Sequence, residues 1–216
     1  MENSHAHRSP FGISQSDRIV WLCEELEIAY ELKHYARDPQ TRLAPAEYRA
    51  LHPFGTAPVI NDGDIVLGES GAIIEYIIAR YGDGRLSVAP DQPNYADYLF
   101  WFHFANGSFM PGAILDMMRA TDALAPGPIA DALLARYDRA YAMTEARLAE
   151  ADYFAGAQFT AADIIMLFPL TTMRMFVPRD LSPYPAIRAY LTRIGERPAF
   201  RRAMEKADPG MAPLLS

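Results

Sequence analysis

Three serines stand close to the start of a predicted helix, in the stretch SPFGISQSDRIVWL, residues 9–22. A helix N-terminus offers backbone amides and positive potential, which favour a bound anion. A serine hydroxyl there can donate a hydrogen bond to a thiolate and lower the pKa of the thiol below its free value of about 8.5. Ser14 and Ser16 both stand at this helix start, so either hydroxyl is a candidate for thiol chemistry.

Two later pairs of residues suggest the rest of a peptide-binding site. Ala57-Pro58 enters the apolar run APVI, and a cis bond before a proline at a strand start would expose backbone groups to an extended peptide. Glu69-Ser70 opens another predicted helix, where Ser70 suits a carboxylate and Glu69 suits an ammonium group. Each feature alone also fits an ordinary cap or turn. Together they predict a site for a small peptide with a thiol and a zwitterionic end.

The elements that must position these residues alternate between helix and strand over the first 80 residues. Apolar residues recur at helical spacing in residues 16–27 and again after Ser70. The segment AYELKHY alternates as a half-buried strand does, and APVI and IVL flank an Asp-Gly turn that is typical of a hairpin. Ser14 is expected to cap the first helix, with Asp17 as its partner in a capping box.

The rest of the chain has helical periods only. DGRLSVAPDQPN is rich in glycine, proline and polar residues and is typical of a linker. The predicted organisation is therefore a small α/β domain over residues 1–82, a linker over 83–92 and an all-α domain over 93–216, an α+β architecture. Within the last part, FTAADI predicts a capping box between Thr160 and Asp163.

Composition excludes several classes of function. A net charge of −7 disfavours nucleic acid as a partner, and no apolar run is long enough to span a membrane. The single cysteine, Cys23, excludes an internal disulfide and is expected to be a buried small hydrophobe. His5 and His7 have no third ligand nearby, so we expect no metal. The N-terminus has no apolar core, so we expect no secretory signal and a cytoplasmic protein.

Six stretches, taken in order, resemble the glutathione transferases, and the likeness runs through essentially the whole chain. They are SQSDRIVWLCEEL, DPQTRLAPAEYRALHPFGTAPVI, LGESGAIIEYIIARYG, YLFWFHFANGSFMP, FTAADI and RPAF. The likeness is greatest to the serine-type branch of bacteria and fungi. One departure is the polar segment MENSHAHRS, where the family's first strand is usually apolar.

The resemblance implies a thioredoxin-like N-terminal domain, a helical C-terminal domain and a homodimer that uses glutathione as co-substrate. It implies that Ser14 activates the thiol, that Ala57 pairs with the glutathione cysteine before a cis Pro58, and that Glu69 and Ser70 hold the γ-glutamyl end. His52 is a candidate for the glycine carboxylate. An electrophile pocket between the domains is expected from five apolar residues: Phe11, Ile13, Trp101, Phe104 and Met110.

Three functions stay open at this point. The first is thiolate attack on a small hydrophobic electrophile, a detoxification reaction. The second is glutathione-dependent reduction of peroxides or disulfides, without a protein cysteine in the SPF segment to form a mixed disulfide. The third is a non-catalytic binding protein on the same fold, which the polar first segment favours.

Overall fold

The computed structural model describes residues 6–8, 14–41 and 43–216, and the chain divides into two compact units. The first unit runs to Leu86 and also includes residues 197–212. The second unit runs from Ser87 to Glu196 and includes residues 213–216. The boundary predicted from sequence placed all of 93–216 together, whereas the structure groups residues 197–212 with the first unit.

The first unit is built on a four-stranded sheet. The strands are β1 (Ala6–Arg8), β2 (Tyr30–Leu32), β3 (Val59–Asp62) and β4 (Ile65–Gly68), in the order β2-β1-β3-β4. β1 is parallel to β2 and antiparallel to β3, and β3 and β4 form the predicted hairpin. The polar N-terminal segment thus does contribute a short central strand, because pairing with neighbours on both sides outweighs its weak strand propensity.

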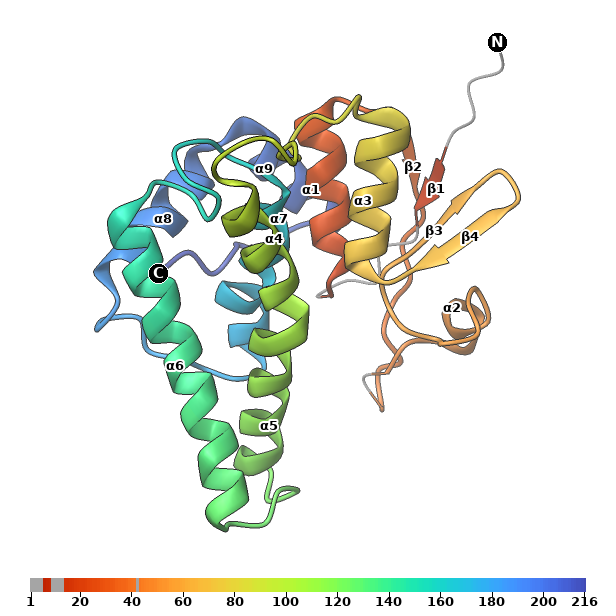
Figure 1. The fold of residues 1–216 in the computed structure, drawn as a ribbon. Helices are drawn as coiled ribbons and strands as arrows, with labels where there is room; N and C mark the ends of the chain where they lie inside the picture. Colours follow the sequence, from red (N-terminus) through yellow and green to blue (C-terminus); the bar gives the residue numbers. More distant parts are fainter. Residues whose placement is uncertain (1–5, 9–13, 42) are drawn as a thin grey trace. The chain divides into compact units, whose positions relative to one another are not determined.

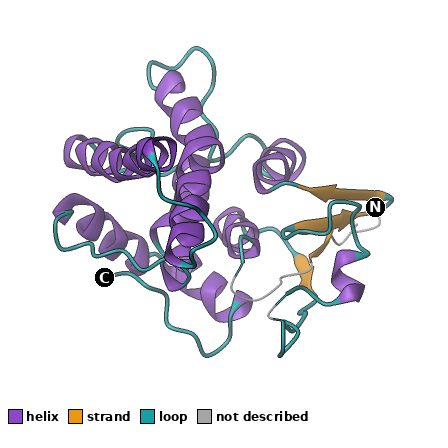
Figure 2. Ribbon diagram, turned by 90° about the horizontal axis from the view of Figure 1, so that it is seen from below, coloured by secondary structure: helices purple, strands orange, loops and turns teal. Residues whose placement is uncertain are grey.

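Helices cover both faces of this sheet. α1 (Ser16–Leu26) and α3 (Ser70–Tyr81) lie side by side against one face, and the short α2 (Ala46–Arg49) lies beyond the other face (Figures 1 and 2). The predicted apolar stripes are buried as expected, and they comprise Ile19, Leu22, Cys23 and Leu26 on α1 and Ile73, Ile74, Ile77 and Ile78 on α3. Because these stripes face the core, they set the orientation of each helix about its own axis. They therefore also set the direction in which the residues at each helix start point.

The last helix, α9 (Pro198–Ala207), packs on α1 although it is distant in sequence. The rings of Trp21 and Phe200 meet edge to face with centroids 5.2 Å apart. Arg197 donates two hydrogen bonds to the Glu25 carboxylate, at 2.8 and 2.7 Å. This bidentate pair and the aromatic contact hold α1 in place from the side away from α3.

The second unit consists of helices. They are α4 (Tyr95–Phe104), the π-helical turn η1 (Ala105–Phe109), α5 (Met110–Ala120), α6 (Pro128–Glu150), α7 (Ala161–Leu170), the 3₁₀ turn η2 (Thr172–Met175) and α8 (Pro185–Glu196). Every residue of α7 is buried, so this helix is the centre of the unit. The predicted capping box at its start is confirmed, with Thr160 as N-cap and Asp163 as its partner.

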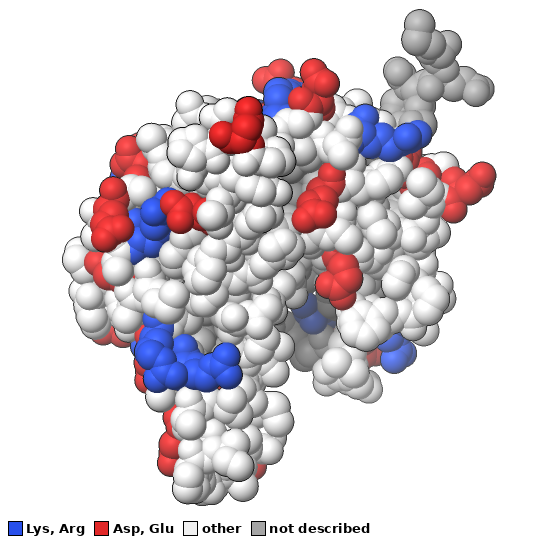
Figure 3. All heavy atoms as spheres, in the orientation of Figure 1, with Lys and Arg blue, Asp and Glu red and all other residues white. Residues whose placement is uncertain are grey.

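The surface carries charges of both signs. On the face shown in Figure 3, Lys and Arg side chains occur in small groups among Asp and Glu. Within the described residues, no helix combines the length and the apolar character that a membrane span requires.

Candidate functional site

Ser14 lies just before α1 and is 8% exposed. The prediction that Ser14 caps α1 is wrong by one residue, because the N-cap is Gln15, which makes no side-chain capping bond. The expected capping box with Asp17 needs Ser14 at the N-cap, and the helical turn instead closes with the Asp17 amide donating to the Ser14 carbonyl at 3.3 Å. The Ser14 hydroxyl oxygen still accepts a hydrogen bond from the Ser16 amide at 3.2 Å, which holds it at the helix start.

Ser14 and Ser16 are neighbours in one hydrogen-bonded pair. The Ser14 hydroxyl donates to the Ser16 hydroxyl oxygen at 3.1 Å, and both side chains are buried. Ser16 is the first residue of α1. The two hydroxyls therefore lie together at the start of α1, and Ser14 precedes the first helical residue.

A buried polar cluster joins this helix start to the start of α3. Arg18 is 1% exposed and donates to the Gln15 side-chain oxygen and, at 3.1 Å, to the Ser70 hydroxyl. The Ser70 hydroxyl also donates to the Gln15 side-chain oxygen at 3.3 Å. The contacts bring Ser70, predicted from sequence as a carboxylate ligand, into one network with the residue that follows Ser14.

Arg18 gives this cluster a fixed positive charge. Burial lowers the pKa of Arg18 to about 9, while the nearby Asp17 carboxylate acts in the opposite direction. A guanidinium with this pKa is still charged at neutral pH. Together with the N-termini of α1 and α3, it produces positive potential where a thiolate or a carboxylate would be stabilised. Sequence reasoning assigned Arg18 no role in the site, because its burial is invisible in a single sequence.

Glu69 occupies an unusual backbone conformation. It is the N-cap of α3, with φ 66° and ψ 114°, and its side chain is exposed. Non-glycine residues at positive φ cost free energy and are found where the surrounding structure demands them, often at ligand sites. In this conformation Glu69 is exposed, while the Ser70 hydroxyl is buried against Gln15 and Arg18.

The peptide bond between Ala57 and Pro58 is cis, as the resemblance implied. Pro58 is buried, and β3 begins at the next residue, Val59. β3 lies between β1 and β4, so the Ala57 backbone leads directly into the middle of the sheet. The segment is thus held rigidly at its C-terminal side.

Tyr48 packs against the segment that leads into β3, and sequence reasoning missed it. Its side chain is fully buried, and burial raises the pKa of Tyr48 to about 12. Its ring packs edge to face on Tyr35, with centroids 5.1 Å apart, and the cluster also includes Ala57. The only available signal was a tyrosine in a short amphipathic helix, which more often indicates core packing.

His52 lies beside the strand that leads to Glu69. Its ring is close to the backbone of Gly68, since a Cβ built on that glycine would be 3.3 Å from His52 Cε1. His52 Nδ1 accepts a hydrogen bond from the Phe54 amide at 3.2 Å. The neutral ring must then carry its proton on Nε2, which leaves Nε2 as a donor.

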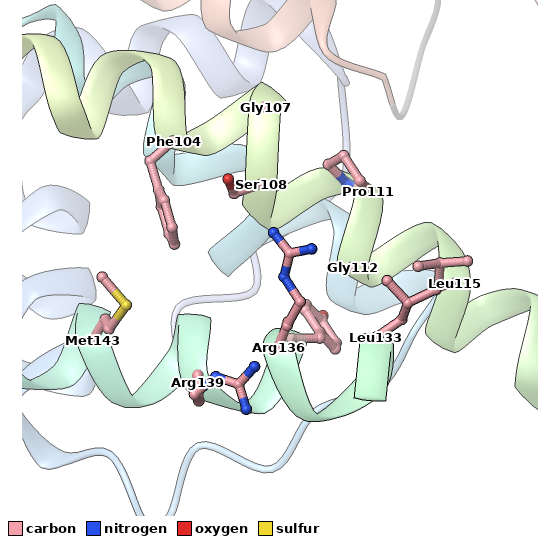
Figure 4. A pocket seen from close by; sticks show the side chains of 11 residues that line it. Phe104, Gly107, Ser108, Pro111, Gly112, Leu115, Leu133, Arg136, Arg139 and Met143 are labelled. Atoms are coloured by element: carbon pink, nitrogen blue, oxygen red, sulfur yellow. The ribbon is translucent and has the colours of Figure 1, made fainter. Parts of the chain in front are cut away.

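Three of the five predicted electrophile residues lie in the helical unit. Trp101 and Met110 are buried, and Trp101 packs on Phe104 with ring centroids 5.3 Å apart. Phe104 also lines a cavity of about 310 Å³ between the η1–α5 segment and α6, where Figure 4 shows it with Ser108, Arg136, Arg139 and Met143. Phe11 and Ile13 lie outside the described residues.

A metal site is not formed by the described residues, among which no group of three or more His, Cys, Asp or Glu side chains is placed to hold an ion. Cys23 is 1% exposed and unbonded to another cysteine.

Comparison with known proteins gives the same family over both units. A family model described as "Glutathione S-transferase, N-terminal domain" matches residues 14–80, and one described as "Glutathione S-transferase, C-terminal domain" matches residues 109–198. Glutathione S-transferase 3 of Schizosaccharomyces pombe is 32% identical, over 94% of this chain and 88% of its own length. A glutathione S-transferase of Escherichia coli K12 is 28% identical, over 87% of this chain and 91% of its own.

Solved structures agree with this result. The crystal structure of a glutathione S-transferase from Actinobacillus pleuropneumoniae superposes with a TM-score of 0.85 and 32% identity, and the match covers 95% of this chain and 94% of that one. The four-stranded sheet with its cis proline and the helical second unit are the two domains of that fold. The chain belongs to the glutathione S-transferase family, with a thioredoxin-like N-terminal domain and an all-helical C-terminal domain.

Proposed function

We propose that this protein is a glutathione transferase that uses Ser14 to activate the glutathione thiolate for attack on small hydrophobic electrophiles. The observation that carries this proposal is the buried Ser14–Ser16 pair at the start of α1, joined through Gln15 and Arg18 to Ser70. The features predicted to hold a thiol and a γ-glutamyl end thus lie in one connected network.

Glutathione would lie along the Ala57 backbone, with its cysteine paired to the segment that precedes β3. Its γ-glutamyl carboxylate would accept hydrogen bonds from Ser70 and the α3 amides, and its ammonium group would face the exposed Glu69 carboxylate. His52, whose Nε2 is a donor, would face the glycine carboxylate. These assignments place the thiol toward the start of α1.

Activation of the thiol would be electrostatic. The Ser14 hydroxyl would donate to the sulfur, and the positive potential of the α1 N-terminus and of Arg18 would stabilise the thiolate over the thiol. The thiolate then attacks the electrophilic carbon, a C–S bond forms, and the leaving group departs with its electron pair. The protein supplies no nucleophile and contributes by positioning and charge stabilisation.

The electrophile would be apolar, because the residues proposed to contact it are Phe104, Trp101 and Met110 with the segment that contains Phe11 and Ile13. Conjugation of such compounds is detoxification chemistry. We include in the proposal a homodimer in the cytoplasm, as the family resemblance implies.

The test measures turnover of an aryl halide, a hydroperoxide and a small disulfide by the wild type and by Ser14→Ala and Ser16→Ala. We expect the aryl halide to be the best substrate and Ser14→Ala to reduce its turnover by roughly 100-fold while glutathione affinity is kept. A larger loss in Ser16→Ala would move the role to Ser16. If the hydroperoxide or the disulfide were turned over fastest, the proposed reaction would be reduction and not conjugation.

Calorimetric titration with glutathione separates these enzymatic outcomes from a binding protein that has lost its activity. Binding without turnover of any of the three substrates would support that third function. Absence of binding at millimolar glutathione would contradict the proposal altogether.

A further inference from the structure

Gln15 joins the two helix starts of the proposed glutathione site. It is the N-cap of α1, it follows Ser14 directly in the chain, and its side chain is partly exposed. Its side-chain oxygen accepts one hydrogen bond from the Arg18 guanidinium and another from the Ser70 hydroxyl, at 3.3 Å. The Gln15 side chain therefore extends from the start of α1 to the start of α3.

The two donors fix which way the Gln15 amide faces. A side-chain amide has one acceptor oxygen and one NH₂ group, and only the oxygen can accept from Arg18 and Ser70. A reversed amide would set its N–H groups against the guanidinium, which is a donor only. The nitrogen is bonded to the same carbon as the oxygen. It is thus held beside the start of α3, and the side-chain hydrogen bonds of Gln15 to other described residues use the oxygen alone.

The place of these N–H donors suits an anion. The N-terminus of α3 has positive potential, and the buried Arg18 guanidinium, which donates to Ser70 at 3.1 Å, adds a full charge beside it. Gln15 is neutral, so it supplies N–H donors without cancelling this charge. A carboxylate has two oxygens that accept several hydrogen bonds, so it can bind the α3 amides, the Ser70 hydroxyl and the Gln15 amide together.

We propose that Gln15 binds the γ-glutamyl carboxylate of glutathione through its side-chain N–H groups, and that Arg18 holds the Gln15 amide in the orientation this requires. The inference rests on the proposed function, because it takes the start of α3 as the site of that carboxylate. A hydroxyl has one proton, so Ser70 releases the Gln15 oxygen when it donates to the carboxylate. The hydrogen bond from Arg18 remains and keeps the Gln15 oxygen turned away from the ligand.

Gln15→Glu tests this with almost no change of shape. Glutamate keeps an oxygen for Arg18 and Ser70, but it replaces the N–H donors with a second, negatively charged oxygen. The probe is S-methylglutathione, because its sulfur cannot ionise and activation of the thiol by Ser14 does not enter the measurement. We expect the dissociation constant of this peptide, measured by calorimetry, to rise roughly 30- to 100-fold, since a hydrogen bond to a charged group is lost and a repulsion is added.

Gln15→Met removes the N–H donors without adding a charge, and should raise the same dissociation constant about tenfold. Unchanged affinity in Gln15→Met would mean that Gln15→Glu acts only through its added charge, and would overturn the inference. Gln158→Glu is the matched control, because it places the same charge at an exposed glutamine of the second unit. It should leave the affinity for S-methylglutathione unchanged, and a loss as large as that of Gln15→Glu would also contradict the assignment.

A second peptide identifies the group of the ligand that Gln15 contacts. γ-Aminobutyryl-S-methylcysteinylglycine is S-methylglutathione without the γ-glutamyl carboxylate. Gln15→Met should bind it as tightly as the wild type does, and Gln15→Glu at least as tightly. A loss of affinity of the same size for both peptides would show that the substitutions disturb the helix start in general, and would overturn the inference.

Failure of the proposed function would give a different result. If the wild type bound neither peptide at millimolar concentration, the proposed function and the role of Gln15 would both be refuted. If the wild type bound S-methylglutathione and turned over an aryl halide through Ser14, while Gln15→Met kept full affinity, only the role of Gln15 would be refuted.

Discussion

Two helix starts in this molecule, those of α1 and α7, use similar residues in different ways. At α7 the Thr160 hydroxyl accepts from the Ala162 amide at 3.3 Å, and the Asp163 carboxylate accepts from the Thr160 amide at 2.8 Å and the Phe154 amide at 3.0 Å. At α1 the N-cap residue Gln15 makes no side-chain capping bond and instead contacts Arg18 and Ser70. The polar side chains at the α7 start bond to nearby backbone amides, and those at the α1 start reach the start of another helix, α3.

This difference separates a helix start that stabilises the fold, at α7, from one that we propose binds a ligand, at α1. Both starts are buried, but at α7 the capping residue and its partner satisfy the local amides, so the structure leaves little to offer a ligand. At α1, Ser14 is placed one residue before the cap and Arg18 adds a buried positive charge. The peptide dipoles of α1 give its start a positive potential, to which the Arg18 charge adds. Variants at the two starts should therefore differ in what they change.

The largest effect is expected from Asp163→Ala. The change removes the acceptor of two buried amides, those of Phe154 and Thr160, each of which costs about 2 kcal/mol when left without a partner. The free energy of unfolding should fall by about 4 kcal/mol, as measured by denaturant unfolding. At temperatures where the variant is folded, the pKa of the bound thiol should be that of the wild type.

The control is Asp152→Ala, which removes an exposed carboxylate paired with Arg193 and should cost under about 1 kcal/mol. If the thiol pKa moved with Asp163→Ala in the folded state, the separation of roles between the two helix starts would be wrong.

The second largest expected effect is a pH dependence of the free energy of unfolding, which arises from Asp163 in α7. Burial raises the pKa of Asp163 from 3.8 to about 6, against the opposing effect of its hydrogen bonds. The folded state thus binds this proton more tightly than the unfolded state, so its contribution to stability is present at low pH and is lost as pH rises from about 4 to about 6. The full change is about 3 kcal/mol.

Unfolding of the wild type and of Asp163→Asn, followed between pH 4 and 7, isolates this contribution because the other titrating groups are shared. The difference in unfolding free energy between the two proteins should grow in favour of the wild type as pH falls. A constant difference across that range would mean that Asp163 does not titrate there.

A smaller effect is expected from Ser70→Ala, on the ligand side of the comparison. Loss of one hydrogen bond to a charged carboxylate should raise the dissociation constant of glutathione about tenfold, as measured by calorimetry. Stability should fall only by about 1 kcal/mol, through the lost acceptor of Arg18. Ser182→Ala, at an exposed serine, is the control. Unchanged affinity in Ser70→Ala would remove the α3 start from the glutathione site.

The regular elements followed from the sequence because their signals are local. The spacing of Ile73, Ile74, Ile77 and Ile78 predicts the buried face of α3, and Thr160 with Asp163 predicts the α7 capping box. The cis bond before Pro58 was predicted from the family resemblance.

Other features depend on contacts between residues far apart in the sequence. α9 packs on α1 through Phe200 and Arg197, and Arg18 reaches Ser70 across 52 positions. Tyr48 of α2 packs with Val59 of β3 in one buried cluster. Composition and periodicity carry no information on such pairs. The cap position at α1 was missed by one residue because Ser14, Gln15 and Ser16 are all able to stand at a helix start.

The most direct test of the account is the pKa of the glutathione thiol when bound to the wild type and to Ser14→Ala. Thiolate absorbance over a pH titration of the saturated complex measures it in the absence of any electrophile. The account predicts that the wild type lowers the pKa by more than one unit from the free value of about 8.5, and that Ser14→Ala returns it most of the way. Equal thiol pKa values in the two complexes would contradict the role assigned to Ser14.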